Sequence, residues 1–168
     1  MIARIIAKIK LLENRFNDLS GQKTGYLIVA MSGSFLGICL ITYLGFRFET
    51  ALIFPPLASS TVVLFESPVS LSKVKCVVGG QLISAIVGVT VSRFLGVTWW
   101  SIAIAVTLAF YLMILTDTLH PPGGSTAFVA VLSNHSYGFV IMPVLLGVGL
   151  LILVALVIHV ILINIRRN

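Results

Sequence analysis

Long uncharged stretches of apolar residues follow one another along most of the chain. These uncharged runs cover residues 24–46, 50–65, 76–92, 94–116, 121–134 and 136–165. A helix needs about 20 mostly apolar residues to cross the hydrocarbon core of a bilayer. Three of these runs have that length, and 76–92 reaches it when Arg93 extends its charge to the interface. The pattern therefore predicts four full spans and two segments that are too short to cross unaided.

A different pattern precedes the first span. Residues 2–19 place isoleucine, leucine and phenylalanine at helical spacing, with charged residues on the other faces. This predicts an amphipathic N-terminal element, residues 1–23, that lies on the cytoplasmic surface of the membrane. A helix that packs on another domain or subunit would show the same pattern. The membrane domain is then expected to comprise residues 24–168.

The composition indicates a protein that lives in lipid. Of the 168 residues, 58% are hydrophobic and 10% are charged, which is far too apolar for a soluble domain. The fold class expected is all-α, a polytopic bundle of membrane helices in a bacterial inner membrane. The two cysteines, Cys39 and Cys76, lie in or beside apolar runs. Neither a disulfide framework nor a metal cluster is expected from them, and no cofactor is indicated.

The net charge of +6 is concentrated near the ends of the chain. The basic residues before the first span and after the last are Arg4, Lys8, Lys10, Arg15, Lys23, Arg166 and Arg167. The positive-inside rule predicts that both termini are cytoplasmic, so the number of crossings is even. Because no aromatic residues interleave with these charges in a basic patch, they do not indicate binding to nucleic acid.

The two short segments are similar to each other. "FPPLASSTVVLFESP" (54–68) and "HPPGGSTAFVAVLSN" (120–134) align without gaps, and each lies between two long spans. This predicts an internal two-fold repeat with halves of about 24–95 and 96–165. Segments that re-enter on one side would give four crossings and parallel halves. Segments that complete a crossing would give six crossings and inverted halves.

Each short segment begins with two prolines, which suit the first turn of a helix. About ten helical residues follow, and these reach roughly 15 Å, half of the hydrocarbon core. The first turn of a helix carries free N–H groups and roughly half a unit of positive charge. Irregular backbone at this depth is tolerated mainly where it lines a cavity. Two converging helix starts therefore predict a site for a small anion.

The candidate binding residues are the helix starts and the hydroxyls that follow them. They are Pro56, Ser59, Ser60, Thr61, His120, Pro121, Pro122, Gly123, Gly124, Ser125 and Thr126. The two glycines would let a ligand approach the backbone closely. The alternative is that the prolines and glycines only kink a helix, while Ser and Thr bond to their own backbone.

Asp117 and His120 are three residues apart, so on a helical turn they would share a face. They are the candidates for proton coupling, because an acidic side chain near the bilayer is expensive enough to indicate a function. They would equally suit the end of an interfacial loop. Import of one negative charge against 100 mV costs about 2.3 kcal/mol, so uptake of an anion needs a coupling ion such as a proton.

The segment "HPPGGSTA" (120–127) resembles the signature of the HPP family of integral membrane proteins. "PPLASSTVVLFESPVSL" (55–71) and "VVGGQLISAIVGV" (77–89) resemble two further blocks of that family. The resemblance implies four membrane-spanning segments and, because plant and cyanobacterial members are associated with nitrite transport, movement of nitrite. The resemblance also identifies residues 120–125 as the signature motif of the family in this chain. At position 81 this chain has glutamine where a histidine is common in the family, and at position 76 it has cysteine where an asparagine is frequent. Both differences bear on which substrate is carried and how its transport is coupled.

The function predicted is membrane transport of a small monovalent anion, with nitrite as the first candidate and protons as a possible partner. The alternative is a non-transporting membrane scaffold or regulatory domain, assembled as a homo-oligomer through small-residue seams. The glycines of those seams are Gly33, Gly37, Gly80, Gly88, Gly147 and Gly149. An enzyme is not expected, because Asp117, His120 and Ser125 are only neighbours in sequence, and catalytic triads are recognised by their geometry.

Overall fold

The computed structural model describes residues 20–48, 54–66 and 70–167, and within these ranges the chain is entirely helical. The elements are α2 (Ser20–Arg47), α3 (Pro55–Phe65), α4 (Leu71–Leu95), α5 (Trp99–Leu115), α6 (Pro122–Leu132), η1 (Val140–Leu145) and α7 (Leu146–Arg167). The all-α class is therefore confirmed. The amphipathic helix predicted for residues 2–19 lies outside the described residues.

The long and short helices fall close to where the apolar runs predict them. Within the described part of the chain, three helical stretches are long and apolar enough to cross a membrane: Ala30–Arg47, Leu71–Leu95 and Val140–Ile158. The helix α5 has 17 residues and is shorter than the full span expected there. The two proline-initiated helices, α3 and α6, have 11 residues each. The first long helix starts at Ser20, four residues before the apolar run that begins at residue 24.

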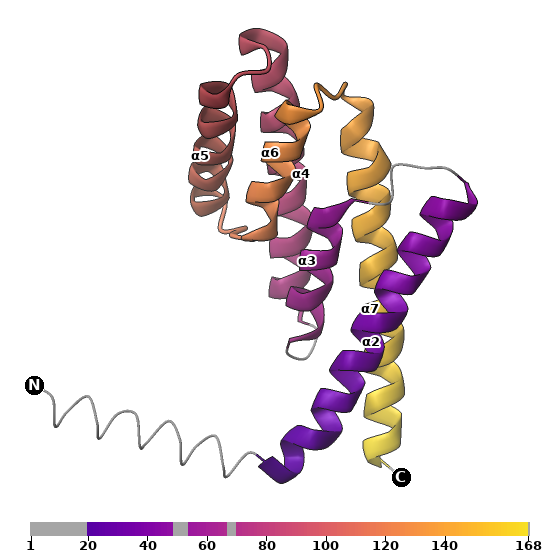
Figure 1. Ribbon diagram of the computed structural model, residues 1–168. Helices are drawn as coiled ribbons and strands as arrows, with labels where there is room; N and C mark the ends of the chain where they lie inside the picture. The colour runs from indigo at the N-terminus through magenta and orange to yellow at the C-terminus, as the bar shows by residue number, and fades with distance from the viewer. Residues whose placement is uncertain (1–19, 49–53, 67–69, 168) are drawn as a thin grey trace, which may run out of the picture.

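The chain reverses its direction at each connection between the labelled helices. Figure 1 shows α2, α4 and α6 rising and α3, α5 and α7 descending, so that α2 begins and α7 ends at the lower end of the bundle. The helix α3 runs from the middle of the bundle to the lower end, and α6 runs from the middle to the upper end. The central helix α4 packs against α3, α5, α6 and α7. The first turns of the two short helices thus meet beside the middle of α4.

The two short helices bury the same faces. When Pro55–Phe65 is aligned with Pro121–Val131, the burial class agrees at ten of the eleven positions, Ala58 and Gly124 being the pair that differs. Side chains three and four residues apart share one face of a helix. The two segments therefore resemble each other in packing as well as in sequence.

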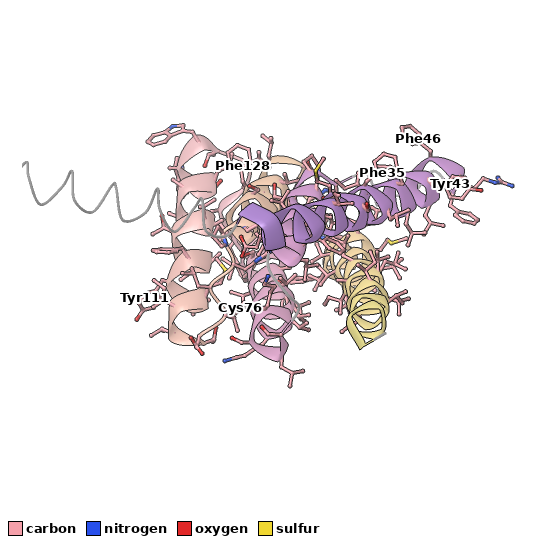
Figure 2. The ribbon with its side chains drawn as sticks, turned by 90° about the horizontal axis from the view of Figure 1, so that it is seen from below. Phe35, Tyr43, Phe46, Cys76, Tyr111 and Phe128 are labelled. Atoms are coloured by element: carbon pink, nitrogen blue, oxygen red, sulfur yellow. The ribbon has the colours of Figure 1, made fainter. Side chains whose placement is uncertain are left out.

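Large apolar side chains cover the outside of the bundle, and small residues make several of the contacts inside it. Phe35, Tyr43 and Phe46 project from α2, and Tyr111 and Phe128 project from α5 and α6 (Figure 2). By contrast, the fully buried contacts of α5 and α6 include the alanines Ala105, Ala109, Ala127 and Ala130. Lipid offers no hydrophobic driving force between helices, so close packing of small residues must hold them together.

The contact between α4 and α6 depends on a glycine. A Cβ atom placed on Gly88 would lie 2.6 Å from the Cβ of Ala130 and 2.7 Å from the carbonyl oxygen of Ala127. Gly147 likewise faces a neighbour, Leu57 on α3, whereas no atom lies within 4 Å of the Cβ position of Gly149. Gly88 and Gly147 therefore pack against neighbouring helices of the same chain, whereas Gly149 has open space beside it.

We expect Gly88→Ala to lower the melting temperature of the detergent-solubilised protein. Overpacking of this kind typically costs about 1–3 kcal/mol, because backbone atoms of α6 must move. Gly149→Ala is the matched control, and it should leave the melting temperature unchanged or raise it slightly, since alanine favours a helix. Equal melting temperatures for the two variants would contradict this packing.

Candidate functional site

Four polar side chains meet where the short helices begin. Ser60 comes from α3, Gln81 from α4, His120 from the turn before α6, and Thr126 from α6 itself. Each of them is 0% or 1% exposed. We call these four residues the junction cluster. Three of them, Ser60, His120 and Thr126, belong to the predicted binding set.

Ser60 lies at the centre of the cluster. Its hydroxyl donates to the carbonyl oxygen of Pro56 at 2.9 Å, within its own helix. Its oxygen accepts from Nε2 of Gln81 at 2.8 Å and lies 2.9 Å from Nε2 of His120. A hydroxyl has one proton and two lone pairs. Because its proton is used at Pro56, the imidazole must donate to Ser60, so His120 carries its proton on Nε2.

The other half of the cluster contains Gln81 and Thr126. The Thr126 hydroxyl donates to Oε1 of Gln81 through a short hydrogen bond. The amide nitrogen of Gln81 thus donates to α3, and the amide oxygen accepts from α6. Buried polar groups have to be satisfied within the protein, because the surrounding lipid offers no partners.

Glycines on α4 bring the turn before α6 into contact with this helix. A Cβ on Gly79 would lie 2.8 Å from Cβ of Thr118, and a Cβ on Gly80 would collide with Cβ of His120. Only a residue without a side chain allows the backbone of the turn to approach so closely. The "GGQ" sequence therefore positions His120 and places Gln81 beside it.

The structure differs from the sequence analysis at the backbone donors. Free N–H groups were expected at the first turns of α3 and α6. Proline has no N–H, and the N–H of Leu57 donates to the carbonyl of Phe54 at 2.9 Å. In α6, the two N–H groups that follow the prolines donate to the carbonyls of His120 and Pro121, at 2.8 and 3.0 Å. The junction therefore offers side-chain donors and helix dipoles rather than bare amides.

The two glycines of the signature have different surroundings. A Cβ on Gly123 would lie 2.6 Å from Oγ of Ser84 and 2.9 Å from the carbonyl oxygen of Gly80. The nearest atom to a Cβ on Gly124 is Cγ1 of Val106, at 3.8 Å. The close approach predicted for a ligand at Gly123 is therefore made by α4.

Several predicted binding residues lie outside the junction cluster. Ser59 and Ser125 are exposed on the outer faces of their helices, as is Pro121. Pro56 and Pro122 are buried in the first turns of α3 and α6. Neighbouring residues on a helix point about 100° apart, so Ser59 and Ser125 each turn away from the buried hydroxyl that follows them.

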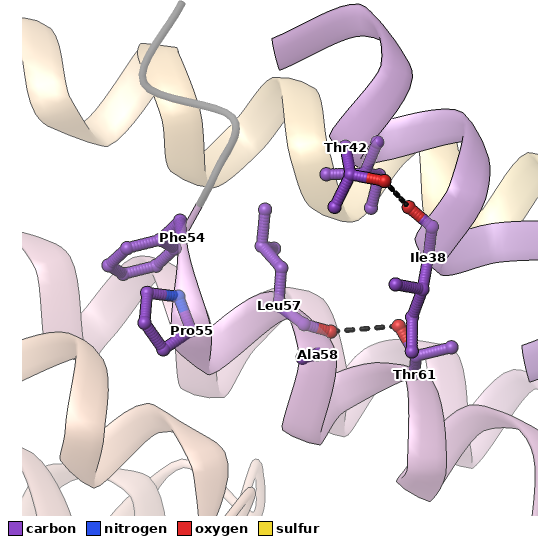
Figure 3. A pocket seen from close by; sticks show the side chains of 8 residues that line it. Ile38, Thr42, Phe54, Pro55, Leu57, Ala58 and Thr61 are labelled. Atoms are coloured by element: carbon purple, nitrogen blue, oxygen red, sulfur yellow. Dashed lines mark hydrogen bonds between the residues drawn. The ribbon is translucent and has the colours of Figure 1, made fainter. Parts of the chain in front are cut away.

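A cavity of about 140 Å³ lies between α2 and the start of α3. It is lined by Ile38, Ile41, Thr42, Phe54, Pro55, Leu57, Ala58 and Thr61 (Figure 3). The hydroxyls of Thr42 and Thr61 donate to carbonyls of their own helices, at 2.7 and 2.9 Å. Because both protons are used, the wall of the cavity offers no hydroxyl donor. Thr61, a predicted binding residue, faces this apolar space.

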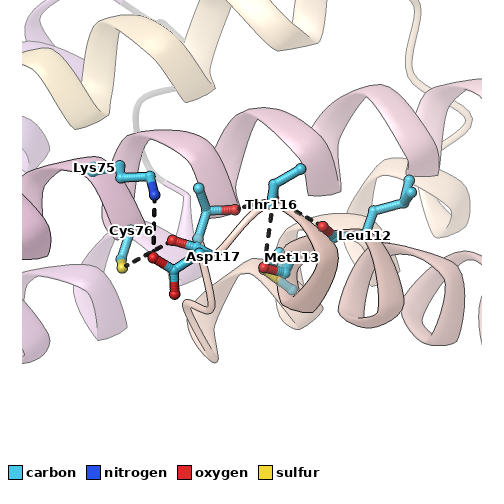
Figure 4. A network of polar contacts seen from close by, with 7 residues as sticks. Lys75, Cys76, Leu112, Met113, Thr116 and Asp117 are labelled. Carbon is cyan, nitrogen blue, oxygen red and sulfur yellow. Dashed lines mark hydrogen bonds and ion pairs between the residues drawn. The ribbon is translucent and has the colours of Figure 1, made fainter.

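Asp117 and His120 are not brought together. The side chain of Asp117 is 98% exposed and pairs with Nζ of Lys75 at 3.3 Å, while its carbonyl accepts from Sγ of Cys76 (Figure 4). Asp117 has a φ of 52°, so the chain leaves the helical path here. This turns the carboxylate outward and the imidazole inward. Within the described residues, no group of three or more His, Cys, Asp and Glu side chains is arranged to hold a metal.

Gln81 is the cluster residue that our prediction of the site missed. The signal was present in the sequence, since a glutamine in the middle of an apolar span must find a hydrogen-bonding partner. The prediction followed the two proline motifs instead, and Gln81 lies outside both of them. Its partners are 21 and 45 positions away in the sequence, so their identity required the fold.

The helices and the buried polar junction define a polytopic helical membrane protein. The family description "HPP, transmembrane region" matches residues 20–167. The chain therefore belongs to the HPP transmembrane family, which confirms the resemblance noted in its sequence.

Two curated proteins of Dictyostelium discoideum, each described as a transmembrane protein, are similar to this chain. They are 31% and 32% identical over 139 residues, which cover 75% of this chain and 49% and 45% of the relatives. The chain thus spans about half the length of the curated relatives it matches. No solved structure matches it.

We expect Gly123→Ala to destabilise the protein and Gly124→Ala to leave its stability unchanged. The added methyl group at Gly123 meets the backbone of α4, whereas the one at Gly124 fits into existing space. The measurement is the melting temperature and folded yield in detergent. An equal loss for both variants would show that the glycines do not differ as described.

Proposed function

We propose that the protein transports a small monovalent anion, with nitrite as the first candidate, past the junction of α3 and α6. The observation that carries this proposal is that two oppositely directed short helices point their N-terminal ends at one buried cluster of neutral polar side chains. Broken helices whose N-terminal ends meet near the middle of the membrane are a recurrent way to hold anionic groups in transporters.

The electrostatics of the junction favour an anion without binding it tightly. Each helix start contributes roughly half a unit of positive charge. None of the four cluster residues is a lysine or an arginine. A passing ion must be bound strongly enough to enter and weakly enough to leave, and helix dipoles with neutral donors meet that requirement.

The transport proposal includes a topology of six crossings with inverted halves. The alternating helix directions, the opposed short helices and their shared burial pattern support this arrangement. It keeps the start of α2 and the end of α7 on one side, which we assign to the cytoplasm from the basic residues near both termini. In a bacterial inner membrane this would place the Lys75–Asp117 pair on the cytoplasmic side of the junction.

His120 is the proposed proton-coupling residue. Its Nε2–H is used at Ser60, and the described residues contain no hydrogen-bonding partner for its Nδ1. A proton on Nδ1 would give the imidazole a positive charge next to the two helix starts. Such a charge is unfavourable there unless an anion accompanies it. Proton and anion would then move together, which removes the cost of carrying negative charge against the membrane potential.

A non-transporting scaffold or regulatory membrane domain is the second candidate. The observation that favours it is that the junction cluster is closed: its members bond to one another and none reaches the surface. A purely structural network would look the same. Transport differs from this alternative because it requires the cluster to open.

We expect the purified protein in liposomes to move nitrite, and Ser60→Ala to reduce the rate about tenfold or more. Without the hydroxyl, Gln81 and His120 lose the common acceptor that aligns their N–H groups at the junction, and about 1.4 kcal/mol of lost interaction with the passing ion corresponds to a tenfold effect. Ser32→Ala is the matched control, since Ser32 also donates to the carbonyl four residues before it, but on an exposed part of α2. Absence of flux in the unsubstituted protein across a panel of nitrite, nitrate and formate would favour the scaffold.

We expect an inward proton gradient to accelerate nitrite uptake in the unsubstituted protein but not in His120→Gln. The glutamine amide retains an N–H donor for Ser60 but has no nitrogen that takes up a proton near neutral pH. The measurement is the ratio of uptake with and without the gradient. The same ratio in both proteins would exclude His120 as the coupling residue.

A further inference from the structure

The side chain of Gln81 connects two helices at matching points. Ser60 and Thr126 each stand five positions after the first proline of their segment, at Pro55 and Pro121. Gln81 donates to the first and accepts from the second. One residue on α4 therefore ties the two short helices together across the junction.

A carboxamide suits this position for a specific reason. Ser60 needs a donor, because its own proton goes to its helix backbone, and Thr126 needs an acceptor for its proton. A neutral amide supplies a donor through its nitrogen and an acceptor through its oxygen. All three side chains are 0% exposed, so these bonds lie away from the surface in the closed cluster.

Two polar atoms of the cluster have unused hydrogen-bonding capacity. The amino group of Gln81 has two hydrogens, one of which goes to Ser60, and the described residues provide no acceptor for the other. The second atom is Nδ1 of His120, whose side chain is 99% buried. The N–H groups with which Gln81 and His120 bond to Ser60 converge on one oxygen atom, so two donors surround one point. A buried polar atom without a partner is unfavourable and needs an explanation.

We propose that Gln81 is the residue that selects the anion passing the junction, an inference that rests on the transport function proposed above. In the closed cluster its amide holds α3 and α6 together. When the helices part, the amino group leaves Ser60 and donates to an oxygen atom of the anion. The protonated His120 donates to the same ion. Two donors around one point suit a small planar anion with two oxygen atoms, the class that includes nitrite and formate.

The experiment measures nitrite and formate flux into liposomes for Gln81→Met and Gln81→Glu. Methionine matches the length and volume of glutamine but has no N–H, so both fluxes should fall at least tenfold at every pH. Glutamate keeps the shape but is anionic when ionised, so flux should be absent at pH 8. At pH 5 a protonated carboxyl regains one donor and one acceptor, and flux relative to the unsubstituted protein should recover at least tenfold.

Thr107→Val is the matched control, because it removes a polar group from the exposed face of α5, away from the junction. It should retain full flux. Unchanged nitrite and formate flux in Gln81→Met would overturn the role of Gln81 and leave the transport function standing. No flux in the unsubstituted protein would overturn both. If Gln81→Met does not fold, the glutamate variant decides: equal relative flux at pH 5 and pH 8 would overturn the selecting role.

Discussion

The constraint on which the structure depends is that polar groups inside a membrane must find their partners within the protein. Lipid supplies neither donors nor acceptors, so each unsatisfied group costs several kcal/mol. The junction cluster meets most of this requirement with side chains from three helices and one turn, and within the described residues it leaves one N–H of Gln81 and Nδ1 of His120 without a partner. Pro56 contributes a carbonyl, Ser60 an oxygen that accepts twice, and Gln81 an amide that joins α3 to α6. The position of the two short helices follows from these bonds, because neither helix is long enough to be held by the bilayer alone.

Close packing makes the hydrogen bonds of the cluster geometrically possible. Polar side chains as short as serine and threonine reach α4 only when the helix backbones are close. Gly80 and Gly123 provide this approach where α4 crosses α6, and Gly88 continues it about two turns further along α4. Membrane helices associate through such contacts between small residues, because burial of apolar surface gains nothing in lipid. The glycines of "HPPGG" and of "GGQ" are therefore two sides of one contact, which places the imidazole of His120 beside the amide of Gln81.

The sequence predicted the elements better than it predicted their partners. Apolar runs and prolines located α3 and α6 closely, because helix starts and lengths are local properties. The pairing of Ser60 with His120 across 60 positions was not local, yet alignment of the two segments had already placed both in one candidate site. Three features could not be read this way. Asp117 turns outward because the chain adopts a positive φ there, Gly123 faces α4 rather than a ligand, and Gln81 has partners on both short helices. Each depends on how α4 packs against the other helices.

The neutrality of the junction cluster links its structural and proposed functional roles. A lysine at this depth would bind an anion strongly, but it would need a permanent counter-ion whenever the site is empty. Neutral groups avoid this problem, because Ser60, Gln81 and Thr126 bond to one another in the closed state. An anion then has to replace hydrogen bonds that are each worth only about 0.5–1.5 kcal/mol net. The helix dipoles provide attraction of similar size at no cost to the closed state. A cluster built in this way favours closure when empty, and in the transport cycle that we propose it opens at a modest cost when an anion and a proton arrive together.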